Sequence, residues 1–298
     1  MDEQQVQTKE YFSKVAKEWA DKAVGKAAKV NVIKQRNGCV LDALDRHGNI
    51  TSFLDVGCGT GDLVHSVAQK GVLATGVDFS ETMIEQAETL CRDMAGNKPR
   101  FLAGNIFDFE FENGQFDAIS ANGFIEYISP VELETFLSRC HGYLKPSGML
   151  ILSARNRLFN CFSLNDYTEL EISQHPEDFQ ALIREAVTLC KCDSVQELKK
   201  LAGDPTAVSM QRFAHPKTNI DVSVRYQFTP LQLTGILEEH GFGVTNLQAI
   251  HSHPAPPGFQ RRFKDVHIRV ADLLYEVARD ALPLIPFAST FMIMGVKH

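Results

Sequence analysis

The sequence of 298 residues lacks a long apolar run of the kind that crosses a membrane. A spanning helix needs roughly 18 to 20 consecutive apolar residues, and the nearest candidate, residues 281–296, is interrupted by Pro283 and Pro286. The first residues, Met1 to Gln5, also lack the basic segment and apolar core of a secretory signal. These absences lead us to expect a cytoplasmic protein.

Positive charge and paired cysteines are also scarce. The chain has 30 basic and 37 acidic residues, with a net charge of −7 and a pI near 5.8, whereas nucleic-acid-binding proteins usually carry a basic face. The seven cysteines are scattered, and Cys190 and Cys192 are one residue short of a CxxC motif. We therefore expect no nucleic-acid partner, no cysteine zinc site, and free thiols in a reducing compartment.

Apolar residues are present in ordinary amounts for a folded protein, since 44% of the chain is hydrophobic and 22% is charged. The length fits one open α/β sheet with insertions. Neither an internal repeat nor a low-complexity tract is found. The sequence therefore predicts one catalytic domain with an added cap.

A glycine-rich loop follows the first apolar run. Residues 53–56 read Phe-Leu-Asp-Val, and Gly57, Gly59 and Gly61 follow at alternate positions before a helix-like pattern. This order predicts a buried strand, a tight turn and the start of a helix. Glycine suits the turn because the backbone must bend sharply and leave room for a ligand.

A second apolar run, residues 72–77, ends in Asp78. In a doubly wound sheet these two strand ends open onto one crevice, where an acid on the second strand holds ribose hydroxyls; the alternative is that Asp78 only caps the next helix. A dinucleotide fingerprint would have glycine in place of Asp62, and a carboxylate there repels a diphosphate. The expected ligand therefore carries a ribose, no phosphate and preferably a positive charge.

These residues resemble the class I S-adenosylmethionine-dependent methyltransferases, in particular their small-molecule group with the type 11 domain. The resemblance rests on Leu54-Asp55-Val56-Gly57-Cys58-Gly59-Thr60-Gly61 and extends from Tyr11 to about Ser153. It implies an α/β fold with a doubly wound, seven-stranded, mostly parallel sheet and helices on both faces. It also implies S-adenosyl-L-methionine as the cofactor and methyl transfer as the reaction.

The resemblance also implies where the cofactor binds. Arg36 falls where many relatives place a basic residue facing the cofactor carboxylate, and Asn105 stands where relatives usually have an aspartate that accepts from the adenine amino group. The amide oxygen of Asn105 can still accept, although Asp108 is an alternative. The expected cofactor residues are Arg36, Asp55, Gly57, Cys58, Gly59, Gly61, Asp78, Phe79, Asn105, Ile106 and Asn122.

We divide the chain into four parts. Residues 1–50 are expected to form N-terminal helices that cover the cofactor site, with a leading helix at 11–19, and residues 51–154 the cofactor-binding core. Residues 155–227 are too long for a structureless loop, so they predict a folded cap, which either binds the acceptor or only covers the pocket rim. Residues 228–298 complete the sheet, with a helical insertion at about 258–280.

The pattern of the core predicts further elements. Strands are expected at 100–103, 116–121, 149–153, 244–250 and 287–297, and helices at 31–44, after Ser80, from Ser129 to about Leu144, after Thr229 and over 263–278. Ser129-Pro130-Val131-Glu132 combines a cap, an early proline and a capping glutamate.

If the acceptor is a hydroxyl, a side chain must act as a base and remove its proton. Positioning of the acceptor against the methyl group nevertheless supplies most of the rate enhancement. We rank His251 and His253 first, because they point to one face of an extended segment and imidazole titrates near neutral pH. Glu126 is second and Tyr127 third. Either histidine could instead be a strand-end residue bonded to backbone. A metal site at the two histidines lacks a matching acid, so we expect no metal.

The sequence therefore predicts a methyltransferase that acts on a hydroxyl, or an amine, of a small molecule or glycan precursor. One alternative is a methyltransferase acting on a protein or RNA, although Asn122-Gly123-Phe124-Ile125 is not the Asn-Pro-Pro-Tyr type of segment that would favour it. The other is a non-catalytic protein that binds S-adenosylmethionine.

Overall fold

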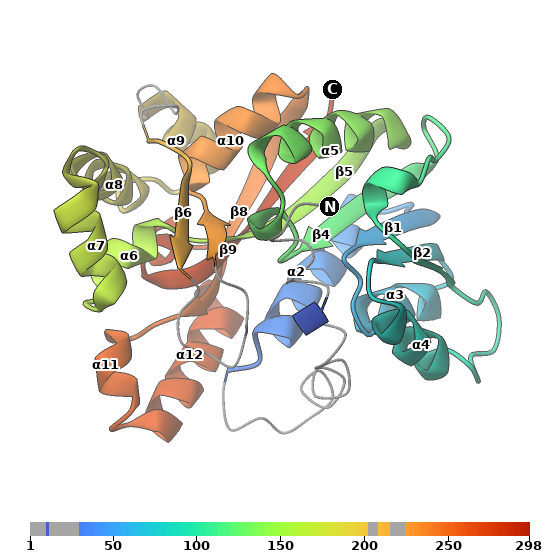
Figure 1. The fold of residues 1–298 in the computed structure, drawn as a ribbon, viewed down its shortest axis with the longest axis horizontal. Coiled ribbons are helices and arrows are strands. Elements are labelled where there is room, and N and C mark those ends of the chain that lie inside the picture. The colour runs from blue at the N-terminus through green and yellow to red at the C-terminus, as the bar shows by residue number, and fades with distance from the viewer. Residues whose placement is uncertain (1–9, 12–29, 202–207, 215–223) are drawn as a thin grey trace.

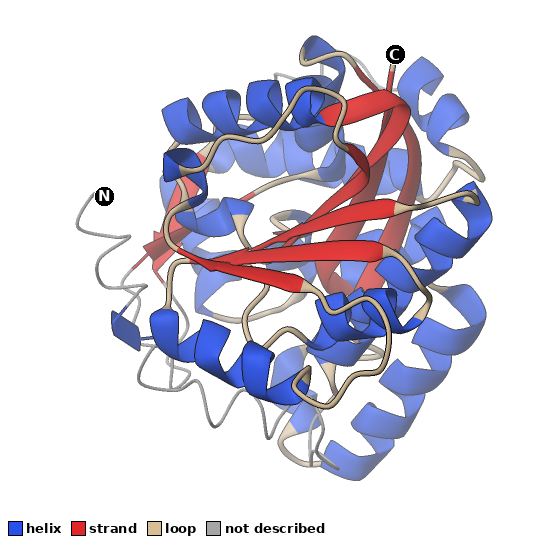
Figure 2. Ribbon diagram, turned by 90° about the vertical axis from the view of Figure 1, so that its right-hand side faces the viewer, coloured by secondary structure: helices blue, strands red, loops and turns tan. Residues whose placement is uncertain are grey.

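The structure, a computed structural model, describes residues 10–11, 30–201, 208–214 and 224–298. A twisted central sheet runs through the molecule, and helices cover both of its faces (Figures 1 and 2). The helix expected at 11–19, with Trp19, lies almost wholly outside the described residues. No helix in the described part of the chain is long and apolar enough to span a membrane.

The sheet has seven strands in the order β3-β2-β1-β4-β5-β9-β8. Only β9 is antiparallel to its neighbours β5 and β8. The strands are β1 (Ser52–Val56), β2 (Leu73–Asp78), β3 (Arg100–Ala103), β4 (Phe116–Asn122), β5 (Leu144–Arg155), β8 (Phe242–Ser252) and β9 (Ala288–Lys297). The mostly parallel, doubly wound sheet expected from the sequence is confirmed, and its strand order reverses between β1 and β4.

Helices flank the sheet in the expected order. They are α2 (Val32–His47), α3 (Asp62–Gln69), α4 (Glu81–Leu90), α5 (Pro130–Tyr143), α10 (Pro230–Glu239), α11 (Pro257–Gln260) and α12 (Lys264–Ala278), with 3-10 turns η1 (Ile106–Asp108), η2 (Ile125–Tyr127) and η4 (Leu282–Phe287). Ser129 and Glu132 form a capping box at the start of α5. The helix after Ser80 ends at Leu90, because the next residues form turns, with the Met94 N–H donating to the Cys91 carbonyl.

A helical segment follows β5, on the left of Figure 1. It contains α6 (Leu158–Phe162), α7 (Asp166–Gln174), α8 (Pro176–Leu189) and α9 (Val195–Leu201), and then the antiparallel pair β6 (Gln211–Ala214) and β7 (Val224–Gln227). Leu182 and Leu198 are fully buried and belong to the same apolar cluster as the sheet. We call this segment the cap, and it shares its core with the sheet.

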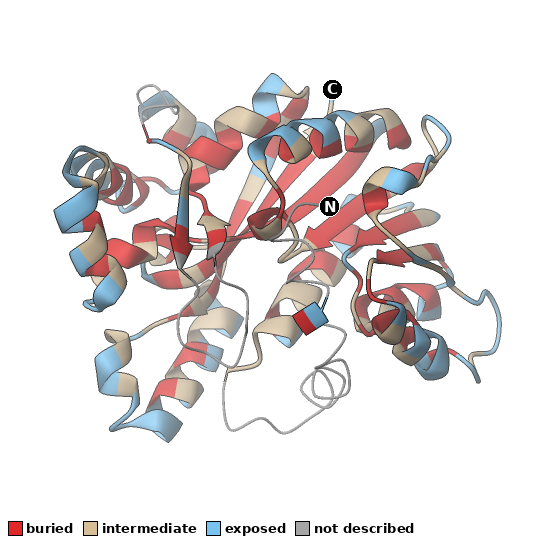
Figure 3. Ribbon diagram, viewed as in Figure 1, coloured by how far each residue is buried: buried red, intermediate tan, exposed pale blue. Residues whose placement is uncertain are grey.

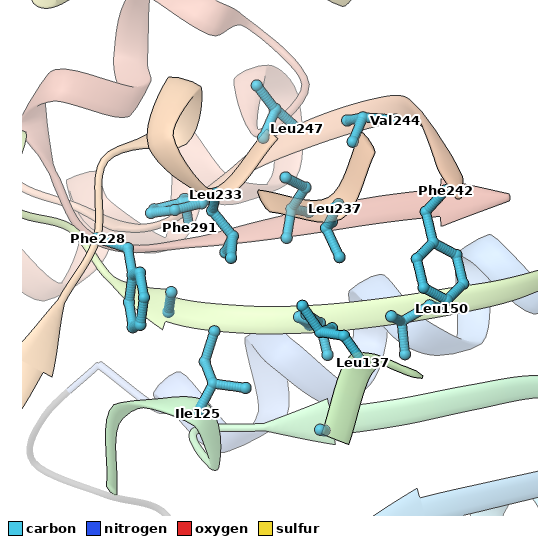
Figure 4. Packing of buried hydrophobic residues seen from close by; sticks show 14 of the residues in the cluster. Ile125, Leu137, Leu150, Phe228, Leu233, Leu237, Phe242, Val244, Leu247 and Phe291 are labelled. Atoms are coloured by element: carbon cyan, nitrogen blue, oxygen red, sulfur yellow. The ribbon is translucent and has the colours of Figure 1, made fainter. Parts of the chain in front are cut away.

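The apolar core lies on both faces of the sheet, whose strands are mostly buried (Figure 3). On one face, Ile125, Leu137 and Leu150 pack near Leu233 and Phe291, which come from α10 and β9 (Figure 4). A second cluster packs α2 and α3 against the other face. Burial of this kind contributes about 25 cal/mol per Å² of apolar surface, so it holds the strand ends in fixed positions.

Candidate functional site

A cavity opens at the carboxyl ends of β1, β2 and β4, where the strand order reverses. Such a switch point is the usual binding crevice of an open α/β sheet. Most of the expected cofactor residues line it: Arg36, Asp55, Gly57, Cys58, Gly59, Asp78, Phe79, Asn105, Ile106 and Asn122.

The glycine loop adopts left-handed backbone at each of its three glycines, with φ of 71° at Gly57, 52° at Gly59 and 77° at Gly61. A Cβ at Gly59 would meet no protein atom within 4 Å, which leaves its backbone open to the cavity. A Cβ at Gly61 would lie 2.7 Å from the Ala87 Cβ. Gly61 is not among the cavity-lining residues, so it allows α3 to pack closely on α4 instead of lining the ligand space as we expected.

Asp78 is fixed at the tip of β2 by two backbone donors. Its Oδ2 accepts from the Gly59 N–H and its Oδ1 from the Ser80 N–H, both at 2.9 Å. Burial raises the pKa of Asp78 to about 6, although these hydrogen bonds oppose the shift. The side-chain cap of α4 is Ser80, which accepts from the Met83 N–H, so capping does not account for Asp78.

Three carboxyl groups, those of Asp55, Asp62 and Asp78, line the cavity around the glycine loop. The Ser120 hydroxyl donates to Asp55, and the Thr60 hydroxyl donates to Asp62 at 2.6 Å. Burial raises the pKa of Asp55 to about 7. Clustered acidic groups favour a cationic ligand and disfavour a phosphate.

The other side of the cavity is rich in guanidinium groups. Glu126 is 2% exposed. One of its carboxylate oxygens lies 3.9 Å from Arg36 Nη2, and the other lies 3.3 Å from Arg155 Nε and 3.5 Å from Arg225 Nη1. Burial lowers the pKa of Arg36 and that of Arg155, the latter to about 10. We call these four side chains the arginine–glutamate cluster, and Arg36, Glu126 and Arg155 line the cavity.

Our sequence analysis did not include Arg155 or Arg225 among the site residues. Arg155 ends β5, so its position at a strand tip was the available signal. Arg225 lies on β7, seventy residues further along the chain, and no local pattern points to it. It brings the cap into contact with the cavity wall.

Asn105 and Asn122 line the cavity in different ways. The Asn105 Oδ1 accepts from the Phe107 N–H at 3.2 Å and so caps η1, which leaves one lone pair on that oxygen for a ligand. The alternative residue, Asp108, is exposed and outside the cavity lining. Both polar side-chain atoms of Asn122 are buried without a hydrogen-bond partner among the described residues, which fits a polar ligand.

His251 and His253 do not line this cavity. His251 lies in β8 and His253 directly beyond its last residue, Ser252. β8 is separated from β4 by β5 and β9, and three strand spacings amount to roughly 14 Å. Their rings do lie together, with centroids 4.2 Å apart, but His251 has left-handed backbone with φ of 53°, so the extended geometry behind that expectation is absent. Burial lowers the pKa of His251 to about 3 and, assisted by the other histidine, that of His253 to about 2. The geometry does not support our first choice of base.

Glu126 and Tyr127, by contrast, both line the cavity. Burial raises the pKa of Tyr127 to about 12, and the charge of Glu126 assists. The phenol therefore stays protonated at neutral pH. Among the four candidate bases, Glu126 alone combines a place on the cavity wall with a carboxylate.

Comparisons with known proteins agree with this geometry. Residues 53–148 match the family described as methyltransferase domain. The chain is 30% identical over 149 residues to the ubiquinone biosynthesis O-methyltransferase of Chromobacterium violaceum, an alignment that covers 49% of this chain and 61% of that protein. It is 36% identical over 132 residues to the demethylmenaquinone methyltransferase of Lactococcus lactis, with coverage of 41% and 51%.

The fold comparison extends further along the chain. The crystal structure of the magnesium protoporphyrin IX methyltransferase of Synechocystis PCC 6803 with bound SAM has a TM-score of 0.57 and 16% identity, and the alignment covers 100% of this chain and 98% of that one. The sequence alignments are shorter than the structural one. The chain covers less than two thirds of the length of the Chromobacterium violaceum and Lactococcus lactis relatives.

Proposed function

We propose that this chain, whose residues 53–148 form a methyltransferase domain of the class I type, transfers a methyl group from S-adenosylmethionine to a hydroxyl of a small molecule. The resemblance drawn from the glycine loop is confirmed by the domain match, and the expected sheet is confirmed by the strand order. The activity, the acceptor and the roles of the site residues are our proposal.

The distribution of charge around the cavity carries this proposal. S-adenosylmethionine has a cationic sulfonium, a ribose and an amino-acid carboxylate, but no phosphate. The carboxyl groups of Asp55, Asp62 and Asp78 gather at the glycine loop, and Arg36 and Arg155 lie on another part of the wall. This arrangement fits a ligand with opposite charges at separate points and disfavours a dinucleotide.

Different cavity residues would bind different parts of S-adenosylmethionine. Asp78 would hold the ribose hydroxyls, because its carboxylate is already fixed by the Gly59 and Ser80 amides. Arg36 would face the cofactor carboxylate, and Asn122 has free donor and acceptor atoms for the same end of the molecule. Phe79 and Ile106 supply apolar surface suited to the adenine ring of the cofactor.

When bound, S-adenosylmethionine supplies a methyl group that is already activated by the sulfonium. The protein's part is then to hold the acceptor oxygen, exclude water and remove a proton. Positioning of this kind can be worth on the order of 7 to 11 kcal/mol. Glu126 takes the proton, and Arg155 stabilises the negative charge that develops on the oxygen.

Several observations support a small acceptor. Arg225 on β7 reaches Glu126, so we propose that the cap contributes to acceptor binding, and the ubiquinone biosynthesis relative is named as an O-methyltransferase. The acidic net charge disfavours a nucleic-acid substrate. The seven cysteines are all free thiols, which supports the cytoplasmic location that we also propose.

Calorimetry tests the cofactor assignment directly. We expect S-adenosylhomocysteine and S-adenosylmethionine to bind in the micromolar range and NAD not to bind. Asp78→Asn should weaken binding by about 100-fold, because hydrogen bonds to a charged group contribute roughly 1.5 to 3 kcal/mol each. Asp93→Asn on the exposed surface is the matched control. Tight binding of NAD, or an unaltered Asp78→Asn, would contradict the assignment.

Methyl transfer needs its own assay, because binding alone does not separate an enzyme from a silent binding protein. A panel of catechols, hydroxylated quinols and simple sugars should be incubated with methyl-labelled S-adenosylmethionine. We expect label to enter an aromatic or enolic hydroxyl, because the guanidinium groups favour an oxyanion. Label entering only protein or RNA would overturn the acceptor class.

A further inference from the structure

His251, His253 and His267 form a compact group outside the cavity, which we call the three-histidine cluster. One ring nitrogen from each lies within 4.8 Å of the others. The ring centroids of His253 and His267 are 5.2 Å apart, and those of His251 and His267 are 5.8 Å apart. His251 lies near the end of β8, His253 directly follows that strand, and His267 lies near the start of α12.

We propose that the three-histidine cluster binds one divalent transition-metal ion, such as zinc, through three imidazole nitrogens. A tetrahedral site with zinc–nitrogen distances of about 2.0 to 2.1 Å requires ligand nitrogens about 3.4 Å apart. The observed separations are within reach of small side-chain rotations. Imidazole ligands select zinc, copper, nickel or cobalt over magnesium and calcium, which prefer oxygen.

Unpaired ring nitrogens supply an independent observation. His253 Nε2 and both ring nitrogens of His267 are buried and have no hydrogen-bond partner among the described residues. Buried polar atoms are nearly always paired, and leaving one unpaired costs about 1 to 3 kcal/mol. These three atoms belong to two rings, and a metal ion at the centre of the cluster would pair His253 Nε2 and one of the two nitrogens of His267.

The Nδ1 atoms of His251 and His253 have the kind of partner that metal-bound imidazoles usually have. His251 Nδ1 lies 3.3 Å from the Ser289 hydroxyl. His253 Nδ1 contacts the Gln260 side-chain amide; rotating that amide by 180° lets its oxygen accept from the ring, because the two ends are interchangeable in shape. Each contact leaves Nε2 of its own ring free to coordinate an ion.

The charge around the cluster is compatible with a dication. Neutral imidazole is the form that binds a metal ion. Arg155 is the nearby cation that affects His251 and His253, and its charge is offset by Glu126 at 3.3 Å. Three protein ligands leave a fourth position for water.

The sequence analysis predicted no metal because it found two histidines and no acid. The third ligand is supplied by α12, which reaches the end of β8 only in the folded chain. An ion at this point would tie α12 to the sheet. The inference does not rest on the proposed methyltransferase activity.

Metal uptake by the full chain is the test. Protein freed of any tag and stripped with a chelator should bind one equivalent of Zn²⁺ by calorimetry. One equivalent of Co²⁺ should give visible absorption without the near-ultraviolet bands of thiolate ligands. We expect binding at least 10-fold weaker in His253→Ala and in His267→Ala, and unchanged binding in His47→Ala, which alters an exposed histidine on α2.

Two results would overturn the proposal: no Zn²⁺ or Co²⁺ uptake by the wild-type protein, or full-affinity uptake by the variants of the cluster. Because His267 is buried, its variant could lose the fold, so circular dichroism should accompany each measurement. If His267→Ala does not fold, the less buried His253→Ala decides the question.

Discussion

At the scale of single residues, the site depends on one buried carboxylate. Glu126 is the only acidic group in the arginine–glutamate cluster, which contains three guanidinium groups. These ion pairs hold the carboxylate in place and also hold Arg36 and Arg155 against the cavity. In the mechanism that we propose, Glu126 would therefore serve both the proton transfer and the positioning of two charged neighbours.

Glu126→Gln keeps the size of the side chain and removes its charge. We expect kcat to fall by about 10² to 10⁴, the usual contribution of a general base, while the cofactor Kd changes only a few-fold. Tyr127→Phe should change kcat a few-fold at most, because the raised pKa of about 12 keeps that phenol protonated. Rates should be measured at saturating cofactor.

The same assay decides between the carboxylate and the histidines. If Glu126→Gln retains most of its kcat while His251→Ala or His253→Ala abolishes turnover, then the proton acceptor is a histidine, which the sequence analysis ranked first. We expect the reverse, because neither histidine lines the cavity.

The sequence predicts those residues of the cavity whose positions follow from the local pattern along the chain. The glycine loop, Asp78 and Asn105 belong to strand ends that alternation and glycine spacing already identify. Arg225 and His267 come from the cap and from α12, so only tertiary contacts reveal them. The placement of His251 and His253 depended on strand order, which a local pattern does not contain.

At the scale of elements, the cap is anchored by a buried charge network. Arg157 is fully buried. It donates to both carboxylate oxygens of Glu171, at 2.9 and 2.8 Å, and also to Asp178 and to the Ser209 carbonyl. Glu171 and Asp178 lie on α7 and α8, so one arginine just beyond β5 holds two cap helices.

Removing Arg157 should lower the free energy of unfolding. Arg157→Met leaves Glu171 buried without its partner, and breaking a buried pair in this way typically costs about 3 to 5 kcal/mol. Urea denaturation should therefore show a large loss of stability. Lys70→Met is the control, because the Lys70–Asp45 pair is exposed and such pairs contribute at most about 1 kcal/mol.

A double variant separates lost charge from lost packing. Arg157→Met combined with Glu171→Gln removes the uncompensated carboxylate, so we expect it to recover part of the lost stability. A double variant that is less stable than Arg157→Met would contradict this explanation, since Glu171 also accepts from the Asn160 amide.

The elements themselves were largely predictable. All seven strands of the sheet were expected, because apolar runs between turn residues mark buried strands. β5 departs most from its expected bounds, since it begins at Leu144 although Lys145 to Gly148 read as a turn. The cap was expected to be folded from its length. Its β6–β7 pair was not foreseen, because each strand has only four residues and its pairing is set by the rest of the molecule.

At the scale of the whole molecule, buried acids make stability depend on pH. Glu185 on α8 accepts from the Leu231 N–H on α10 at 2.9 Å, and so lies where the cap meets the C-terminal part of the core. Burial raises its pKa from the ordinary value to about 7. In the folded protein Glu185 therefore keeps its proton up to about pH 7, whereas in the unfolded chain a glutamate loses it near pH 4 to 5.

Glu185→Gln should remove this dependence. Since the folded pKa is raised, the stability that Glu185 contributes is complete below about pH 4 and is lost as pH rises through about 7. We expect the variant to gain about 1 to 3 kcal/mol at pH 8 and nothing at pH 4, since one pKa unit equals about 1.4 kcal/mol. Urea denaturation at both pH values measures this.

The exposed Glu239→Gln is the matched control, and it should leave the pH dependence unchanged. An equal gain for Glu185→Gln at both pH values would show that a packing change, and not the proton, is responsible.

The position of β9 has a consequence for how the protein is made. β9 follows every other strand in the chain, yet it lies between β5 and β8. While the ribosome is still synthesising residues 288–297, β5 and β8 each present an unpaired edge, and open strand edges invite association with other chains. Closure of the sheet must therefore wait until this strand has left the exit tunnel, and until then the open edges of β5 and β8 can associate with other chains.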